Sequence, residues 1–298
     1  MKLLELFEAK RKEKRPVFWD GAMGTQLIAR GLVGKAPELW NLEQPDLIKE
    51  IHKAYVLAGA EVIQTNTFGA NRLKLKTAGL EGKLIELNQQ AVEIAKSASG
   101  GKALVAGDIG PTGEMMAPIG SLSSELAEEV FAEQAEVLAK SGVDLFSIET
   151  MFDLEEMKSA IRGIKKVAPG IPIVAEMTFK KTARGFFTMM GISPEQAIKG
   201  MEEAGADVVG ANCSIGPEKM VELVNQMRKI TDSWLIVQAN AGEPRLEGEK
   251  EIYEYGAEEF ADYAIKMFEA GADAIGACCG SNPEFIRLMV ERFEGGKK

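Results

Sequence analysis

One phrase recurs four times along the chain and sets the fold class. Its copies are "AGAEVIQTN" (58–66), "SGVDLFSIET" (141–150), "AGADVVGANC" (204–213) and "AGADAIGACC" (270–279), each after a helix-like segment. A glycine after the last helical residue is the expected helix cap, and the apolar run that follows suits a strand buried on both faces. The repeat therefore predicts a series of helix-to-strand units.

Four more apolar runs raise the number of predicted strands to eight: "PVFWDG" (16–21), "ALVAGDIG" (103–110), "IPIVAEMTF" (171–179) and "WLIVQANAG" (234–242). Segments with apolar residues at helical spacing alternate with these strands, near 46–58, 82–98, 122–140, 153–167, 194–204, 217–230, 257–270 and 283–293. Eight such units indicate an α/β fold of the (β/α)8 or TIM barrel type. A doubly wound open sheet is the alternative, but it rarely needs eight such regular units.

No Ser/Gly-rich linker or low-complexity tract divides the 298 residues, so we predict a single domain over 1–298. Residues 1–14 are read as an N-terminal helical extension. The net charge of −10 argues against nucleic acid as a partner. No apolar run approaches the length of a membrane helix, and the N-terminus lacks the apolar core of a signal peptide. We therefore expect a cytoplasmic protein with reduced cysteines.

All three cysteines of the chain fall at the C-terminal ends of predicted strands, where barrel enzymes carry their chemistry. Cys213 ends the sixth strand, and Cys278 and Cys279 end the eighth. In a barrel, one strand separates the sixth strand from the eighth, so the three sulfurs could lie close together. Three thiolates could bind Zn²⁺ and leave its fourth coordination position open. Buried packing of small apolar thiols and a redox pair are the alternatives. The other polar strand ends are Asp20, Asn66, Asp108, Glu149, Glu176 and Asn240.

Several catalytic classes lack their residues. The single histidine, His52, lies in a helical stretch far from any strand end, so a histidine-activated nucleophile lacks its base. Neither a GxxxxGKS phosphate loop nor a GxGxxG fingerprint occurs. Lys180 and Lys181 form a charged pair that is expected to be exposed, which makes a lysine Schiff-base lyase a poor alternative.

The cysteine arrangement resembles the zinc-binding signature of the homocysteine S-methyltransferase family, with "GANCS" followed by "GACCG". "WDGAMGTQL", "IQTNTFGAN", "GDIGPTGE", "SIETM" and "NAGEP" are similar to further family segments in the right order, from about residue 15 to 292. "GDIGPTGE" most resembles the homocysteine module of cobalamin-dependent methionine synthases. Two departures are Ala277, where the family usually has glycine, and Ala239, where it usually has proline.

The resemblance implies one Zn²⁺ held by Cys213, Cys278 and Cys279, with homocysteine entering as a zinc-bound thiolate and leaving as methionine. It implies that Glu149 and Asp20 lie on the amino-acid side, with Glu149 the better candidate for the ammonium. The backbone N–H groups of Gly21, Ala22, Met23 and Gly24 would receive the carboxylate. Asn66 and Thr67 would shape the pocket. Asn240 would support the zinc or occupy its fourth position when homocysteine is absent.

The methyl donor that this resemblance favours is methylcobalamin, free or on a corrinoid protein or module. No corrinoid-binding signature occurs in the chain, so the donor is expected on another domain or protein. S-methylmethionine and betaine remain alternative donors. A non-catalytic barrel that binds zinc or thiols is the alternative outside catalysis.

Overall fold

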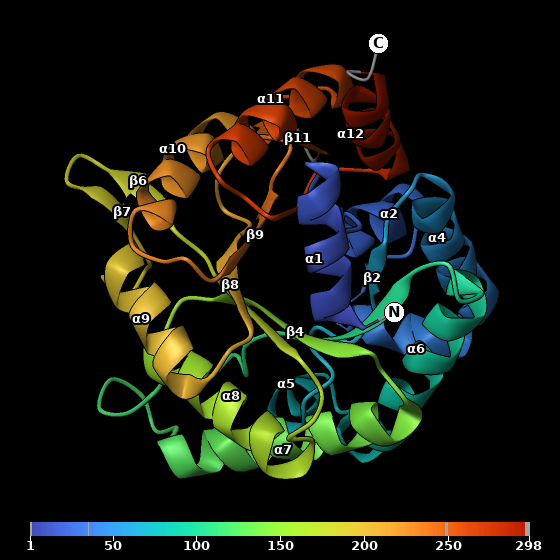
Figure 1. The fold of residues 1–298 in the computed structure, drawn as a ribbon. Coiled ribbons are helices and arrows are strands. Elements are labelled where there is room, and N and C mark those ends of the chain that lie inside the picture. The colour runs from blue at the N-terminus through green and yellow to red at the C-terminus, as the bar shows by residue number, and fades with distance from the viewer. Residues whose placement is uncertain (1, 35, 248–249, 296–298) are drawn as a thin grey trace.

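The computed structural model describes residues 2–34, 36–247 and 250–295. Within this part, eight parallel strands form one sheet in the order β1-β12-β9-β8-β5-β4-β3-β2. A parallel bridge between Trp19 and Val62 joins the two ends of this sheet and closes it into a barrel. Figure 1 looks down this barrel and shows the helices arranged around it. The predicted single-domain (β/α)8 barrel is confirmed.

Each barrel strand lies inside a segment predicted as a strand, except that β4 extends one residue beyond its predicted segment 141–150. The strands are β1 (Val17–Phe18), β2 (Val62–Gln64), β3 (Leu104–Ile109), β4 (Leu145–Met151), β5 (Ile173–Met177), β8 (Val208–Asn212), β9 (Trp234–Ala239) and β12 (Ala274–Ala277). The outer helices also lie where the periodicity placed them: α4 (Pro45–Leu57), α6 (Leu84–Ser99), α7 (Ser124–Ser141), α8 (Leu154–Val167), α9 (Pro194–Ala204), α10 (Pro217–Arg228), α11 (Ala257–Glu269) and α12 (Pro283–Gly295). Glycines in the left-handed conformation end α7 and α9, as the repeated phrase predicted.

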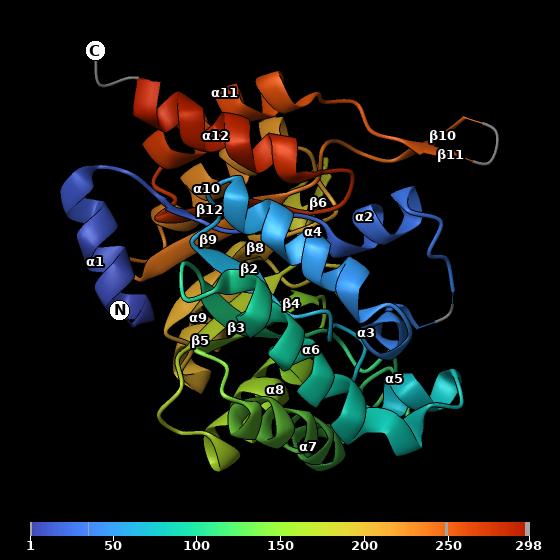
Figure 2. The same cartoon turned by 90° about the vertical axis from the view of Figure 1, so that its right-hand side faces the viewer.

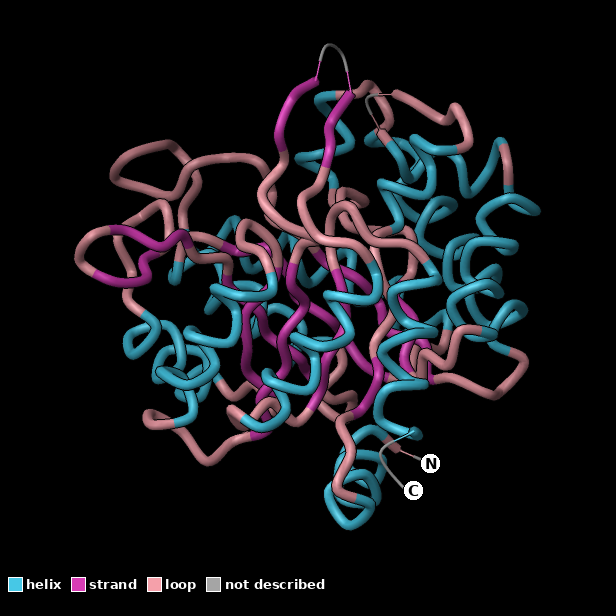
Figure 3. The backbone as a smooth tube through the Cα atoms, turned by 90° about the horizontal axis from the view of Figure 1, so that it is seen from above, coloured by secondary structure: helices cyan, strands magenta, loops and turns pink. Residues whose placement is uncertain are grey.

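Short elements that the periodicity did not predict fill the loops. They are α2 (Met23–Ala29), η1 (Pro37–Leu39), α3 (Trp40–Glu43), α5 (Arg72–Thr77), η2 (Glu81–Lys83) and the hairpins β6 (Lys180–Thr182) with β7 (Gly185–Phe187) and β10 (Arg245–Glu247) with β11 (Lys250–Ile252). Figure 2 shows α2, α3, α5 and the β10–β11 hairpin on the side of the barrel opposite α1. The same hairpin projects from one edge of the molecule in Figure 3. The strand C-termini open toward this side.

Helix α1 (Leu3–Glu13) closes the other end of the barrel. Its residues Leu3, Leu6 and Phe7 are buried in one cluster with side chains from the barrel strands and their ends, including Trp19 and Ile236. This helix occupies most of the predicted extension 1–14, of which Met1 lies outside the described residues. Because α1 seals this end, the open end that remains is the one formed by the βα loops.

The strand order brings the cysteine-bearing strand ends close together. β9 lies between β8 and β12, as predicted, so a single strand separates the ends of the two strands that carry the cysteines.

Ala277 keeps strand geometry in β12 and donates its N–H to the Asp20 carbonyl. The strand therefore accommodates the methyl group that distinguishes alanine from the usual glycine at this position. Among the helices of the described residues, none has the length and apolar character needed to cross a bilayer.

Candidate active site and metal centre

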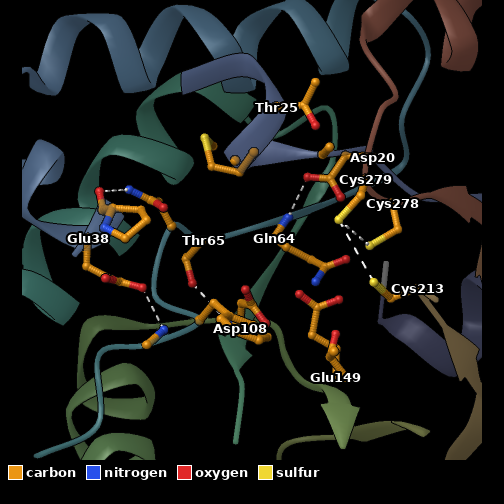
Figure 4. Close-up of a pocket in the computed structure, with 18 of the residues that line it drawn as sticks. Asp20, Thr25, Glu38, Gln64, Thr65, Asp108, Glu149, Cys213, Cys278 and Cys279 are labelled. Atoms are coloured by element: carbon orange, nitrogen blue, oxygen red, sulfur yellow. Dashed lines mark hydrogen bonds between the residues drawn. The ribbon is translucent and has the colours of Figure 1, made fainter. Parts of the chain in front are cut away.

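The three cysteine sulfurs meet at the mouth of the barrel. Cys213 Sγ lies 3.9 Å from Cys279 Sγ, which lies 3.9 Å from Cys278 Sγ, and all three atoms fall within 4.8 Å of one another. Cys213 and the next residue, Ser214, take φ values of 59° and 61°, a left-handed turn that is rare outside glycine. The chain accepts this local strain where β8 ends, and the turn brings Cys213 toward the β12 cysteines. Figure 4 shows the three side chains pointing toward one another.

This sulfur cluster fits a tetrahedral metal. Thiolates at about 2.3 Å from Zn²⁺ lie about 3.8 Å apart in a tetrahedron, close to the observed spacing. Hydrogen bonds with Cys278 and Cys279 lower the pKa of Cys213. The hydrogen bond with Cys213 in turn raises the pKa of both Cys278 and Cys279. The protein alone therefore stabilises one thiolate, and a soft cation would allow all three thiols to ionise.

A cavity of about 400 Å³ lies beside the sulfurs, within the usual size range of small-molecule sites. The predicted site residues that line it are Asp20, Gly21, Ala22, Met23, Gly24, Asn66, Glu149, Cys213, Cys278 and Cys279. The lining also includes residues that the sequence analysis did not select, among them Thr25, Glu38, Gln64, Thr65, Phe68, Lys74 and Gln238. Figure 4 shows the three cysteines on one side of the cavity and Glu38 on the other. Gln64, Asp108 and Glu149 lie between them.

Glu149 lies in the cavity wall near Cys213, at the C-terminal end of β4. Burial, followed by the negative charge of Cys213, raises its pKa to about 7. Asn212 Nδ2 donates to Glu149 Oε2 at 2.7 Å and partly offsets that shift. This carboxylate would be stabilised in its charged form by a cation in the cavity, such as the ammonium group of an amino acid.

Further buried carboxyl groups make the mouth strongly acidic. Asp20 accepts the Gln64 N–H at 2.8 Å, and its pKa is raised well above the usual range, mainly by burial. Burial and the charge of Glu149 do the same to Asp108, whose Oδ1 has no hydrogen-bond partner within the described residues. Glu176 lies deeper in the barrel and accepts from Gln238 Nε2 at 2.9 Å. An acidic cavity of this kind favours cationic groups.

The loop Gly21–Gly24 leads directly into α2, so its backbone is partly helical. The N–H of Ala22 donates to Ser281 Oγ at 3.0 Å, and its carbonyl accepts from the Tyr55 hydroxyl at 3.0 Å. A Cβ atom at Gly21 would lie 2.7 Å from the same Ser281 Oγ. The Ala22 N–H is therefore already bonded, and the N–H groups at the start of α2 are better placed to receive a carboxylate than a four-residue nest.

Thr67 and Asn240 do not line the cavity. The Thr67 hydroxyl donates to the Asp108 carbonyl at 2.7 Å, so it holds the wall from behind. Asn66 does line the cavity, but its amide also donates to Pro37 O and to Asn41 Oδ1, which fixes the loop before α3. The side chain of Asn240 hydrogen-bonds to Cys213, while its own Oδ1 is buried without a partner within the described residues. His52 is fully buried in α4, as expected for a packing residue.

Some of the residues that sequence reasoning missed could have been found from the sequence, and others could not. Gln64 and Asn212 are the last residues of β2 and β8, so a strict reading of strand ends could have found them. Glu38 comes from η1 and accepts the Gly69 N–H at 2.6 Å. Nothing in a single sequence indicates that this loop folds back over the mouth.

The comparisons with known proteins agree with this geometry. The family model described as "Homocysteine S-methyltransferase" matches residues 17–293. The chain belongs to the homocysteine S-methyltransferase family. This confirms the resemblance found in the cysteine segments.

Two curated relatives are each named methionine synthase, from Mycobacterium leprae (strain TN) and Mycobacterium tuberculosis (strain ATCC 25618 / H37Rv). Each is 31% identical over 297 aligned residues, which cover 93% of this chain and 24% of the relative. This family member thus spans about a quarter of the length of these curated relatives.

Solved structures show the same barrel. The metallated form of the homocysteine methyltransferase MmuM from Escherichia coli has a TM-score of 0.78 at 24% identity, and the alignment covers 96% of this chain and 99% of MmuM. Its oxidized form has a TM-score of 0.77 at 25% identity, covering 93% and 96%. The carboxyl transferase domain Y628A of Rhizobium etli pyruvate carboxylase has a TM-score of 0.57 at 16% identity, covers 97% and 49%, and shares the fold alone.

Proposed function

We propose that this chain binds homocysteine and methylates its sulfur to give methionine, using a Zn²⁺ ion held by Cys213, Cys278 and Cys279. The observation that carries the proposal is the sulfur cluster beside an acidic cavity. Three sulfurs from two strand ends leave one tetrahedral position free for a substrate thiol. The family membership and the relatives named methionine synthase support this assignment. The MmuM structure described as metallated supports a metal in this fold.

The protein residues bind and orient the amino-acid part of the substrate. Ionised Glu149 accepts the ammonium group. Asp20, which follows β1 in the cavity wall, adds a second carboxyl group, whose ionised form the ammonium would stabilise against the cost of burial. The substrate carboxylate lies against the N–H groups of Met23 and Gly24 at the start of α2. When bound, zinc supplies a Lewis acid that lowers the pKa of the substrate thiol, so that the sulfur is a nucleophile at neutral pH.

The remaining residues support this arrangement. The side chain of Asn240 hydrogen-bonds to Cys213, and its unpartnered Oδ1 makes it the candidate for the fourth position in the absence of substrate. Asn66 and Thr67 fix the walls through the contacts described above. The thiol proton leaves to solvent, the sulfur lone pair forms the new bond to the methyl carbon, and the donor departs with the electron pair of the bond that held the methyl group. No histidine is needed for any of these steps.

A corrinoid is the donor that we favour, as methylcobalamin on another domain or protein. The curated relatives named methionine synthase are about four times as long as the matched segment, which leaves room for donor-carrying modules in those proteins. The single histidine of this chain is buried in α4 and cannot reach cobalt. The exposed mouth therefore receives the methyl group from outside. A cytoplasmic setting suits the three reduced thiols.

A small-molecule donor is the second candidate. The barrel covers 99% of MmuM, a protein named homocysteine methyltransferase, so one barrel can make up such a protein. S-methylmethionine and betaine are the donors to test for this alternative. A barrel that binds zinc and homocysteine but accepts no methyl donor is the third.

One assay separates these candidates. Reduced, zinc-loaded protein is incubated with L-homocysteine and, in turn, methylcobalamin, S-methylmethionine or betaine, and methionine is quantified. We expect methionine with methylcobalamin, loss of activity after chelation, and recovery with Zn²⁺ and reductant. If methionine forms with S-methylmethionine or betaine but not with methylcobalamin, the methyl donor is that small molecule and not a corrinoid. Activity that survives prolonged chelation would contradict the zinc-dependent function.

A further inference from the structure

Asn212, the last residue of β8, is joined to the end of β4 across an intervening strand. The sheet order places β5 between β4 and β8. The register of β4 against β5 shifts between Ile148 and Met151, which leaves Glu149 and Thr150 as a bulge. Thr150 takes a φ of 59° within that bulge. Bulges next to active sites redirect a side chain, and here the redirected side chain is Glu149.

The Asn212 side chain uses both of its ends on this bulge. Its Oδ1 accepts the Thr150 backbone N–H at 2.8 Å. Its Nδ2 donates to Thr150 Oγ1 at 2.8 Å and to Glu149 Oε2 at 2.7 Å. Asn212 is fully buried, and its amide therefore has a partner for the oxygen and for each of the two N–H donors. A saturated amide of this kind has one stable orientation.

Asn212 also precedes Cys213 directly. The Cys213 N–H donates to the Gln238 carbonyl at 2.9 Å, so the backbone at this position is held by β9 while the Asn212 side chain holds β4. The carboxylate proposed for the ammonium group and the first proposed metal ligand thus depend on one residue. A shift of Glu149 or of Cys213 would therefore displace the other through Asn212.

We infer that Asn212 is a positioning residue, which sets the aim of Glu149 at the substrate ammonium relative to the sulfur of Cys213. The inference rests on the proposed homocysteine site. A residue that merely stabilised the bulge would affect folding, whereas a positioning residue changes how well the site distinguishes thiols with an ammonium group from thiols without one. The discriminating pair is L-homocysteine and 4-mercaptobutanoate, which differ by the amino group.

The test is calorimetric titration of zinc-loaded protein with each thiol, for the wild type, Asn212→Ser and Asn212→Asp. Serine is too short to span the bulge, and aspartate keeps the shape and the acceptor but cannot donate to Glu149. We expect the wild type to bind homocysteine more tightly than 4-mercaptobutanoate. In both variants this preference falls about tenfold, as expected for a displaced charged hydrogen bond, while the dissociation constant of 4-mercaptobutanoate changes less than threefold.

A double-mutant cycle with Glu149→Gln gives a second readout. If Asn212 acts through Glu149, Asn212→Ser has little further effect on the preference once Glu149 is neutral. Asn225→Ser, an exposed asparagine on α10 whose amide bonds to Val221 O, is the matched control and keeps the wild-type preference. Zinc content and thermal unfolding are measured for every variant.

The outcomes separate the inference from the proposed function. A wild type that binds neither zinc nor homocysteine would overturn the proposed function and the inference together. A wild type that prefers homocysteine, with an equal preference in zinc-loaded Asn212 variants, would overturn the inference alone. Additive effects of Asn212→Ser and Glu149→Gln would also count against it, because they would show independent roles.

Discussion

At the scale of single residues, the site is built from groups that are costly to bury and that a cation would stabilise. The pKa of Glu149 is raised to about 7 by burial and by the nearby thiolate, and those of Asp20 and Asp108 are also raised. Each group therefore makes the metal-free fold less stable as it ionises. Zn²⁺ and the substrate ammonium would stabilise these negative charges. The residues that destabilise the ligand-free fold therefore favour binding of the metal and the substrate.

Glu149 gives a pH-dependent stability that can be measured in metal-free protein. Its folded pKa of about 7 exceeds the unfolded value of 4.5, so the folded chain holds the extra proton between these pH values. The stabilisation is full below pH 4.5 and is lost as the pH rises to about 7, by up to about 3 kcal/mol. In urea titrations across this range, Glu149→Gln should flatten the decline. Glu86→Gln, exposed on α6, should leave it intact; an unchanged slope in Glu149→Gln would contradict this account.

At the scale of elements, the barrel separates a structural end from a chemical end. Helix α1 fills the structural end with Leu3, Leu6 and Phe7, while the βα loops carry the cysteines and carboxyl groups at the other. Changes at the structural end should therefore alter stability without altering the site.

Phe7 provides the test of that separation, because it is 1% exposed and packs on Trp234. Phe7→Ala should lower the free energy of unfolding by about 3–5 kcal/mol through lost burial and the cavity left behind. Leu4→Ala, on the same helix but 39% exposed, should cost less than about 1 kcal/mol. Both proteins should hold as much zinc as the wild type under folding conditions. Selective loss of zinc from Phe7→Ala at a pH and temperature where it remains folded would show that the two ends are coupled.

Gly280 tests the loop that carries the paired cysteines. It follows Cys279 with a φ of 84°, and a Cβ atom there would lie 2.3 Å from the Tyr253 ring. Gly280→Ala should displace the loop and weaken zinc binding about tenfold or more in chelator competition. Gly79→Ala has a similar φ of 70° but open space around it, so it should cost only the backbone strain of about 1 kcal/mol and leave zinc affinity unchanged. Equal zinc affinities in the two variants would refute the steric argument.

Much of this element-scale organisation could be predicted from the sequence. Eight strands and eight outer helices follow from the repeated glycine phrase and the apolar periodicity, since buried strands and amphipathic helices leave strong patterns. The short elements α2, α3 and α5 leave no such pattern, because they are held by tertiary bonds such as Asn66 to Pro37. The same reason explains why Glu38 was missed and why the bond from the Thr67 hydroxyl to the Asp108 carbonyl could not be foreseen.

At the scale of the whole molecule, an acidic chain gathers its reactive groups at one open end. The net charge of −10 and the buried carboxyl groups at the mouth both favour a cationic ligand over an anionic one. The strand order β12-β9-β8 brings together cysteines that are 65 positions apart, which the sequence predicted through the barrel geometry. The bulge in β4, which turns Glu149, could not be predicted, because it is held by the Asn212 side chain of β8, a strand that is not adjacent to β4 in the sheet.

The most direct test of the whole account is the metal content of reduced protein by elemental analysis, with the wild type beside Cys213→Ser. The account predicts about one zinc per wild-type chain and its loss in Cys213→Ser, because removing one of three thiolates opens the site. Thermal unfolding of both proteins should show that the mutant remains folded. A reconstituted, reduced wild type without zinc, or a Cys213→Ser protein that keeps it, would contradict the central claim that these three cysteines form one metal site.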